Sequence, residues 1–90
     1  MAFEWDDDKR ILNRAKHGLD FLVVEELFEQ RVLEQPACRS AGEDRWMATG
    51  MVGDIWVTAI FTWRGENIRI ISVRRARGGE RRKHQTVYGS

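Results

Sequence analysis

The stretch IWVTAIFTWRGENIRIISVRR, residues 55–75, decides the fold. β-Branched and aromatic side chains dominate both halves of it, and the Arg-Gly-Glu-Asn sequence at 64–67 suits a tight turn. We therefore predict two antiparallel strands. On the first strand, one face carries Ile55, Val57, Ala59, Phe61 and Trp63, which we expect to face covering helices, and the other carries Trp56, Thr58, Ile60, Thr62 and Arg64, which we expect to be open. On the second, strict alternation places Ile68, Ile70, Ser72 and Arg74 opposite Arg69, Ile71, Val73 and Arg75.

Working outward, the alternating residues 45–52 and the Gly53-Asp54 dipeptide predict a preceding strand and a two-residue hairpin turn. Residues 31–35 are interpreted as a further strand that stops at Pro36, and residues 3–5 as a short one. After Ala76 the pattern becomes polar and permits a last helix, whose start Gly78-Gly79 is expected to delay.

Two helices precede these strands. Asp6 supplies an N-cap, Ile11, Leu12 and Ala15 recur at helical spacing, and Gly18 is a C-terminal stop, which predicts a helix over 7–17. A second N-cap at Asp20 and an apolar stripe at Phe21, Val24, Leu27 and Phe28 predict a helix ending near Gln30. The predicted fold class is α+β, with the N-terminal helices packed on an antiparallel sheet and a short C-terminal helix, in a single domain over residues 1–90.

The composition of the 90 residues is that of an ordinary globular protein. The acidic N-terminus does not resemble a secretion signal and no apolar run is long enough to span a bilayer, so we expect a cytoplasmic location and no membrane contact. Cys38 is the single cysteine, which rules out an internal disulfide and a cysteine-based zinc cluster. We expect no metal and no cofactor.

Charge is divided unevenly along the chain. Residues 1–42 carry a net charge of −3 and residues 43–90 a net charge of +4. The segment 69–83 alone holds seven Lys or Arg against one acid. Such a block indicates a phosphate-rich partner or an acidic protein surface, although a solvated helix face would also explain it.

Several segments resemble one family when taken in order. The opening FEWDDDKRILNRAKHGLDF has the F-x-W-D start, charged helix and K-H-G of BrnT-type toxins of bacterial toxin–antitoxin systems, and GEDRWMATG, FTWRGENIRIISVRRA and ERRKH are similar to its later strands and last helix. One departure is Lys83-His84, where the family commonly has a tyrosine after E-R-R.

The resemblance implies an α+β fold similar to the RelE ribonuclease toxins and metal-independent endoribonuclease activity that arrests growth. It also implies neutralisation by a BrnA-like antitoxin, in a heterotetramer of two toxin–antitoxin pairs. Operator DNA would be bound only through the antitoxin.

Cleavage of RNA by its own 2′-hydroxyl needs a cationic clamp for the phosphate, and the arginine fork suits that task. Our clamp candidates are Arg64, Arg74 and Arg81, which we expect to converge at one end of the sheet, with surface ion pairs as the alternative role. Further RNA-binding candidates are Arg45, Arg69, Arg75, Arg77, Arg82 and Lys83.

Candidates for proton transfer are Glu80, His17 and His84. Glu80 is slightly favoured as a partner that orients Arg77 or Arg81, and His17 as a structural residue at the end of its helix. His84 is expected near a mobile terminus. Trp5 and Trp63 are assigned to the core, while Trp56 is left between core and base stacking.

Two other functions fit the same basic surface. One is a non-catalytic nucleic-acid-binding module, and the other is a protein-interaction domain that docks on an acidic partner. Turnover of RNA distinguishes the enzyme from both.

Overall fold

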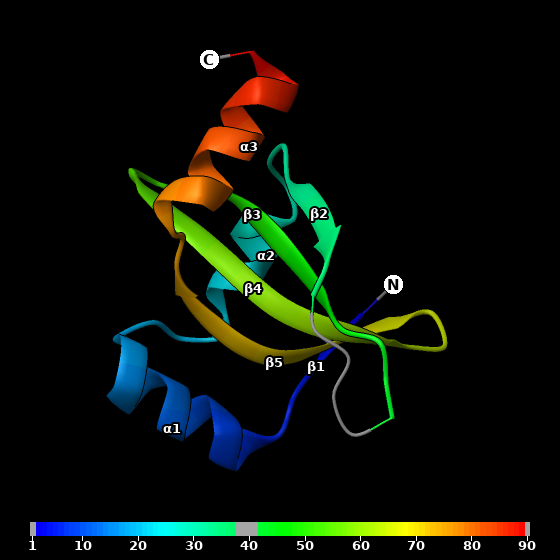
Figure 1. Ribbon diagram of the computed structural model, residues 1–90. Helices are drawn as coiled ribbons and strands as arrows, with labels where there is room; N and C mark the ends of the chain where they lie inside the picture. Colours follow the sequence, from blue (N-terminus) through cyan, green and yellow to red (C-terminus); the bar gives the residue numbers. More distant parts are fainter. Residues whose placement is uncertain (1, 38–41, 90) are drawn as a thin grey trace.

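The computed structural model describes residues 2–37 and 42–89, which form a twisted sheet with helices around it (Figure 1). No helix in these ranges is long and apolar enough to cross a membrane. In chain order the elements are β1 (Phe3–Glu4), α1 (Asp7–His17), α2 (Val23–Leu27), β2 (Leu33–Pro36), β3 (Trp46–Val52), β4 (Ile55–Arg64), β5 (Asn67–Arg75) and α3 (Gly78–Tyr88).

The five strands form one sheet in the order β1-β5-β4-β3-β2. The run from β2 to β5 is antiparallel, as predicted, and both tight turns place a glycine at positive φ, Gly53 at 60° and Gly65 at 61°. β1 pairs in parallel with β5, so the sheet is mixed rather than wholly antiparallel. β2 includes Pro36, which is tolerated because this strand is at the edge of the sheet.

The core lies between the sheet and the α2 segment. Val57, Ala59 and Phe61 of β4 are fully buried there against α2 side chains, which confirms the face assigned to the middle of this strand. Trp5 packs beside this core, whereas the assignment of Trp63 was wrong, because its side chain is exposed near the end of β4.

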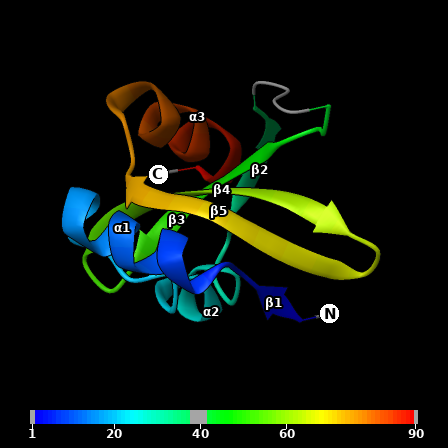
Figure 2. The same cartoon turned by 90° about the horizontal axis from the view of Figure 1, so that it is seen from below.

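The opposite face of the sheet is covered by α3 along part of its length. Figure 2 shows α2 and α3 on opposite sides of the strands. Thr58 is fully buried and donates to Glu80 of α3, and Thr62 is buried and donates to the Asp44 carbonyl. The expectation that the Thr-bearing face is open was therefore wrong at both threonines.

A β-bulge changes the alternation of β5. Phe61 pairs with Ile70 and Ile60 with Ser72, which leaves Ile71 without a partner residue on β4. Beyond the bulge every side chain changes face relative to strict alternation. Val73 consequently joins Ile68 and Ile70 in the core, while Ser72 and Arg74 share the face of Thr58, which corrects the predicted grouping.

α1 has the predicted bounds and caps but an unexpected orientation. The Asp6 carboxylate accepts from the backbone N–H of Asp8 and Lys9, and Gly18 ends the helix at φ 70°. Ile11 and Leu12 nevertheless point to solvent, and Asn13 is the buried residue of this helix. α1 lies beside β5 (Figure 1), where a strand edge presents polar backbone groups rather than an apolar surface.

α2 is shorter than predicted. The Asp20 carboxylate accepts from Leu22 N–H at 2.9 Å, but the next contacts are tight turns, such as Val23 N–H to the Asp20 carbonyl. Turns also replace the helix from Phe28 to Gln30, so only five residues are helical.

α3 begins at Gly78, so the two glycines do not delay it. Glu80 accepts from the Arg77 backbone N–H and thereby caps the first turn. At eleven residues, α3 is as long as α1 and is not the short helix that was predicted.

Candidate active site

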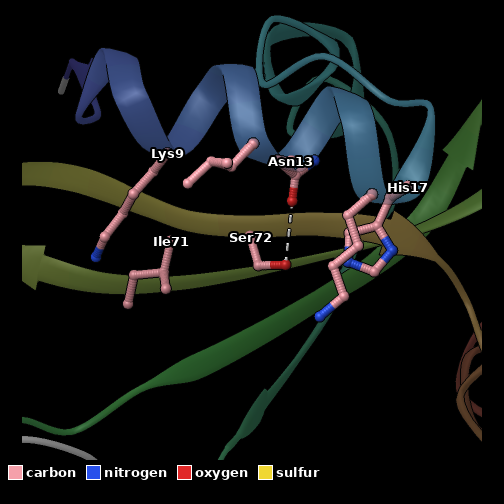
Figure 3. Close-up of a pocket in the computed structure, with 7 residues that line it drawn as sticks. Lys9, Asn13, His17, Ile71 and Ser72 are labelled. Carbon is pink, nitrogen blue, oxygen red and sulfur yellow. Dashed lines mark hydrogen bonds between the residues drawn. The ribbon is translucent and has the colours of Figure 1, made fainter.

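A cavity of about 250 Å³ lies between α1 and the bulge of β5. Figure 3 shows Lys9, Asn13 and His17 descending from successive turns of α1 toward Ile71 and Ser72. Residues four apart on a helix share a face, so the spacing 9, 13, 17 aligns these three side chains. The lining residues are Lys9, Leu12, Asn13, Lys16, His17, Ile71 and Ser72.

Asn13 fixes the distance between helix and strand. Its Oδ1 accepts from the backbone N–H of Val73 at 3.0 Å and its Nδ2 donates to the Val73 carbonyl at 2.8 Å. The amide thus satisfies both backbone groups of Val73 as a neighbouring strand would, beyond the point where the pairing of β1 with β5 ends. Nδ2 also donates to the Leu19 carbonyl, and Ser72 Oγ donates to Oδ1 at 3.3 Å.

The cavity is cationic. Lys9, Lys16 and His17 contribute basic groups, and none of the seven lining residues is acidic. Lys9 and Lys16 are exposed and His17 is half-buried, so the basic groups meet solvent at an open rim. Two ammonium groups beside an imidazole can bind an anion such as a phosphate and transfer a proton to or from it.

Among the cavity residues, only His17 was a sequence-based site candidate. Four polar cavity residues were missed, because the site candidates were chosen mainly where arginines are dense in the sequence. They are Lys9, Asn13, Lys16 and Ser72. The available signal was the helical spacing of Lys9, Asn13 and His17, on the side of α1 away from Ile11 and Ala15.

Arg74 and Glu80 form a second polar cluster, two residues beyond Ser72 on the same face of β5. Two parallel hydrogen bonds join them, Nη1 to Oε1 at 2.9 Å and Nη2 to Oε2 at 2.8 Å, and their side chains are only 16% and 13% exposed. Thr58 Oγ1 also donates to Glu80, and it shares a 2.8 Å hydrogen bond with Thr49.

The Glu80 carboxylate accepts hydrogen bonds from the Arg74 guanidinium, the Arg77 backbone N–H and the Thr58 hydroxyl. These contacts lower the pKa of Glu80 to about 2. A carboxylate held so firmly in its ionised form is a weak proton acceptor. Glu80 does act as an ion-pair partner, but the guanidinium that it orients belongs to Arg74, and Arg77 contributes only its backbone N–H.

The expected convergence of Arg64 with Arg74 was wrong. Arg64 pairs with Asn67 beside the β4–β5 turn, whereas Arg74 pairs with Thr58. The six residue steps from Thr58 to Arg64 correspond to about 20 Å of strand. The bulge and the long hairpin thus place the two arginines toward opposite ends of the sheet.

Two other candidate arginines lie toward the end of the sheet where Arg64 is located, and each is beside an acidic side chain. Arg69 pairs with Thr62 and lies 3.4 Å from Glu4, and Arg45, just before β3, lies 3.5 Å from Glu43. These contacts match the alternative role of surface ion pairs.

The remaining cationic candidates surround the start of α3. The Arg81 guanidinium lies 5.7 Å from the ring centre of Trp56, which is half-buried under α3. The other side chains of this group are exposed, and they are Arg75, Arg77, Arg82 and Lys83.

His84 is buried, so its expected position near a mobile terminus was wrong. Its Nε2 donates to the Arg31 carbonyl at 2.7 Å, and its ring lies between Trp56 and Tyr88 with centroids 5.0 and 4.7 Å away. These contacts fix α3 to the sheet, and they leave His17 as the histidine that lines a cavity.

Within residues 2–37 and 42–89, no three His, Cys, Asp or Glu side chains are grouped so as to hold a metal ion. Cys38 lies outside the described residues.

Comparison with known proteins identifies a family and a related crystal structure. A family model described as the ribonuclease toxin BrnT of type II toxin–antitoxin systems matches residues 5–80. The crystal structure of the Brucella abortus ribonuclease toxin BrnT is 39% identical, covers 86% of this chain and 97% of its own, and superimposes with a TM-score of 0.67. A search of curated proteins gives no match.

Proposed function

Because the chain belongs to the BrnT family of ribonuclease toxins of type II toxin–antitoxin systems, we propose that it cleaves RNA without metal at the cavity between α1 and β5. The observation that carries this assignment is the lining of that cavity, two lysines and a histidine with no carboxylate. Its volume, about 250 Å³, is slightly below the roughly 300–1,000 Å³ of small-molecule pockets, which suits one phosphodiester group.

The proposed reaction is attack of a ribose 2′-hydroxyl on the adjacent phosphorus. The 2′-oxygen–phosphorus bond forms, the bond to the 5′-oxygen breaks, and the product carries a 2′,3′-cyclic phosphate. A base must take the 2′ proton, cations must stabilise the charge on the phosphorane oxygens, and an acid must protonate the leaving oxygen.

The cavity residues can fill these roles. His17 takes the 2′ proton, since a neutral imidazole has a ring nitrogen that can accept one. Lys9 and Lys16 bind the non-bridging oxygens, and one of these ammonium groups protonates the leaving 5′-oxygen. Ser72 lines the same cavity, where its hydroxyl donates to Asn13 Oδ1.

The arginine candidates take supporting roles in this proposal. Arg74 and Glu80 hold the start of α3 against the sheet, because the fork of Arg74 is already bound to Glu80. Flanking phosphates are bound by the cations around the start of α3, which are Arg75, Arg77, Arg81, Arg82 and Lys83. More distant phosphates are bound from the β4–β5 hairpin end by Arg45, Arg64 and Arg69.

A toxin of this type has an antitoxin partner and an RNA substrate. We propose that the antitoxin is BrnA-like, that two toxin–antitoxin pairs form the inhibited complex, and that operator DNA is bound only through it. We also propose that the fold is RelE-like, as the resemblance to the family implies.

The test is incubation of purified, antitoxin-free protein with a defined RNA in EDTA. Wild-type protein should leave 2′,3′-cyclic phosphate or 3′-phosphate ends. His17→Ala and the double variant Lys9→Ala/Lys16→Ala should cleave at least about 100-fold more slowly, the lower range for loss of acid–base catalysis. Arg31→Ala, which removes a cation beside Tyr88, is the matched control and should retain the wild-type rate.

Cleavage by His17→Ala at the wild-type rate would remove the cavity from the mechanism. Arg64→Ala and Arg81→Ala, run alongside, then show which cationic region carries the activity. RNA that is bound but intact supports a non-catalytic binding module, and RNA that is neither bound nor cut supports a protein-interaction domain.

A further inference from the structure

α1 presents its apolar residues to solvent. Ile11 is 64% exposed and Leu12 68% exposed, and Ala15, one turn from Ile11, is exposed as well. At 100° per residue Ile11 and Ala15 each lie about 160° from Asn13, which faces β5, while Leu12 lies about 100° from it, at the edge of this side. In an ordinary surface helix the apolar stripe faces the core, so α1 has the reverse arrangement.

The surface beside these residues is hollowed. One hollow of about 430 Å³ is lined by Ile11, Arg14, Ala15 and Gly18. Another of about 370 Å³ is lined by Asp7, Arg10, Ile11 and Arg14. Ile11 and Arg14 line both, so they form a ridge with a recess on either side that can receive the side chains of a partner.

Positive charge accompanies the ridge. Asp20 is bound bidentately by Arg10, at 2.9 and 3.1 Å, while Arg14 reaches it only at 3.6 Å and keeps 62% of its side chain exposed. The guanidinium of Arg14 can therefore receive a second carboxylate with a paired geometry. A partner surface that complements this ridge therefore carries apolar side chains with an acidic side chain beside them.

We infer that this solvent-facing side of α1 is the docking surface for an amphipathic, acidic helix of the antitoxin. The inference rests on the proposed function, which supplies the antitoxin as the partner. Leu12 is exposed and also lines the catalytic cavity, so a helix seated over Ile11 would reach the cavity rim. Docking there closes the approach of RNA to Lys9 and Lys16.

The experiment measures calorimetric binding of the purified cognate antitoxin to full-length toxin variants. Ile11→Asp should weaken binding at least tenfold, because a charge is placed where an apolar contact forms, and Arg14→Glu should weaken it through charge reversal. Val87→Asp introduces the same charge at an exposed apolar position of α3 and should bind as wild type. Circular dichroism confirms folding, and Ala15→Glu replaces Ile11→Asp if that variant is unfolded.

RNA cleavage by the same variants separates this inference from the proposed function. Ile11→Asp should cleave RNA at the wild-type rate and escape inhibition by the antitoxin. Wild-type affinity of both Ile11→Asp and Arg14→Glu for the antitoxin would overturn the inference, whether or not RNA is cut. A toxin dimer in sedimentation that Ile11→Asp dissociates, with antitoxin binding unchanged, would assign the surface to a second copy instead.

Discussion

At residue scale, Glu80 combines the roles of ion-pair partner and helix cap. One carboxylate binds the Arg74 guanidinium, the Thr58 hydroxyl and the Arg77 backbone N–H, and so joins β4, β5 and the first turn of α3. Removing one member of a mostly buried pair is costly because the other keeps its charge without a partner.

The stability of the protein should therefore depend on pH through Glu80. Its pKa is about 2 in the folded protein against an ordinary 4.5, so the ionised form stabilises folding. This contribution is complete above roughly pH 5 and is lost as pH falls through 4.5 toward 2. After allowance for screening by nearby solvent, we expect about 2 kcal/mol.

Urea unfolding of wild type and Glu80→Gln across pH 2–7 measures this dependence. The variant should be less stable by about 2 kcal/mol at pH 7, and the difference should vanish near pH 2. The Asp20 carboxyl, whose pKa Arg10 also lowers, titrates in both proteins and cancels in the difference. A difference independent of pH would contradict the role given to the carboxylate.

Asn13 gives a second prediction at this scale. Asn13→Ala removes the partner of both backbone groups of Val73, and we expect a loss of about 2–3 kcal/mol in the free energy of unfolding. Asn67→Ala, at an exposed position, should change it by less than about 0.5 kcal/mol. Equal effects of the two substitutions in urea unfolding would show that the amide does not secure α1.

At the scale of elements, the β5 bulge and α3 determine which side chains meet. The bulge at Ile71 directs Ser72 and Arg74 to the side of the sheet where α3 lies. α3 is attached there at three positions, Glu80 near its start, His84 in its middle and Tyr88 at its end. Glu80 bonds β4 and β5, whereas His84 and Tyr88 bond the adjacent carbonyls of Arg31 and Val32, just before β2.

Weakening these contacts should release α3 in steps. Tyr88→Phe removes the 2.6 Å hydrogen bond to the Val32 carbonyl and should cost about 1 kcal/mol. His84→Ala removes both a hydrogen bond and ring packing, and should cost about 2–3 kcal/mol. Val87→Ala on the exposed side is the control, and hydrogen exchange of α3 amides is the direct measurement. Unchanged exchange in His84→Ala would contradict this attachment.

At the scale of the whole molecule, the proposed RNA surface has two main cationic regions. One is the cavity of α1 and β5, and the other is the set of exposed cations around the start of α3. Each phosphate contact on a single strand contributes about −0.7 to the slope of log K against log salt.

Binding of a 2′-O-methyl RNA, which lacks the attacking hydroxyl, tests this arrangement by salt titration. Lys9→Ala/Lys16→Ala should make the slope less negative by about 0.7, because both lysines bind one phosphate, and Arg77→Ala/Arg81→Ala/Arg82→Ala by up to about 2.1. The first variant loses cleavage of natural RNA as well, whereas the second should mainly lose affinity. A slope unchanged in both would place the RNA elsewhere on the molecule.

The features that depend on near neighbours in the chain could be predicted from the sequence. The bounds and caps of α1, the hairpins turning at Gly53 and Gly65, and the core face of β4 follow from local backbone preferences and side-chain periodicity. The motifs also determined the family, because they occur in order along nearly the whole chain. The sequence showed that residues 69–83 are strongly basic, but it did not show which side chains these residues contact in the folded protein.

Which of these elements face one another depends on contacts between residues that are distant in the chain. One unpaired residue, Ile71, changes the face of every later side chain on β5, and no local signal predicted it. The backbone edge of β5 selects Asn13 as the inward residue of α1, which turns Ile11 outward and gathers Lys9 and His17 over Ser72. Hydrogen-bond satisfaction at a strand edge is a property of the assembled sheet, so the site could be located only after folding.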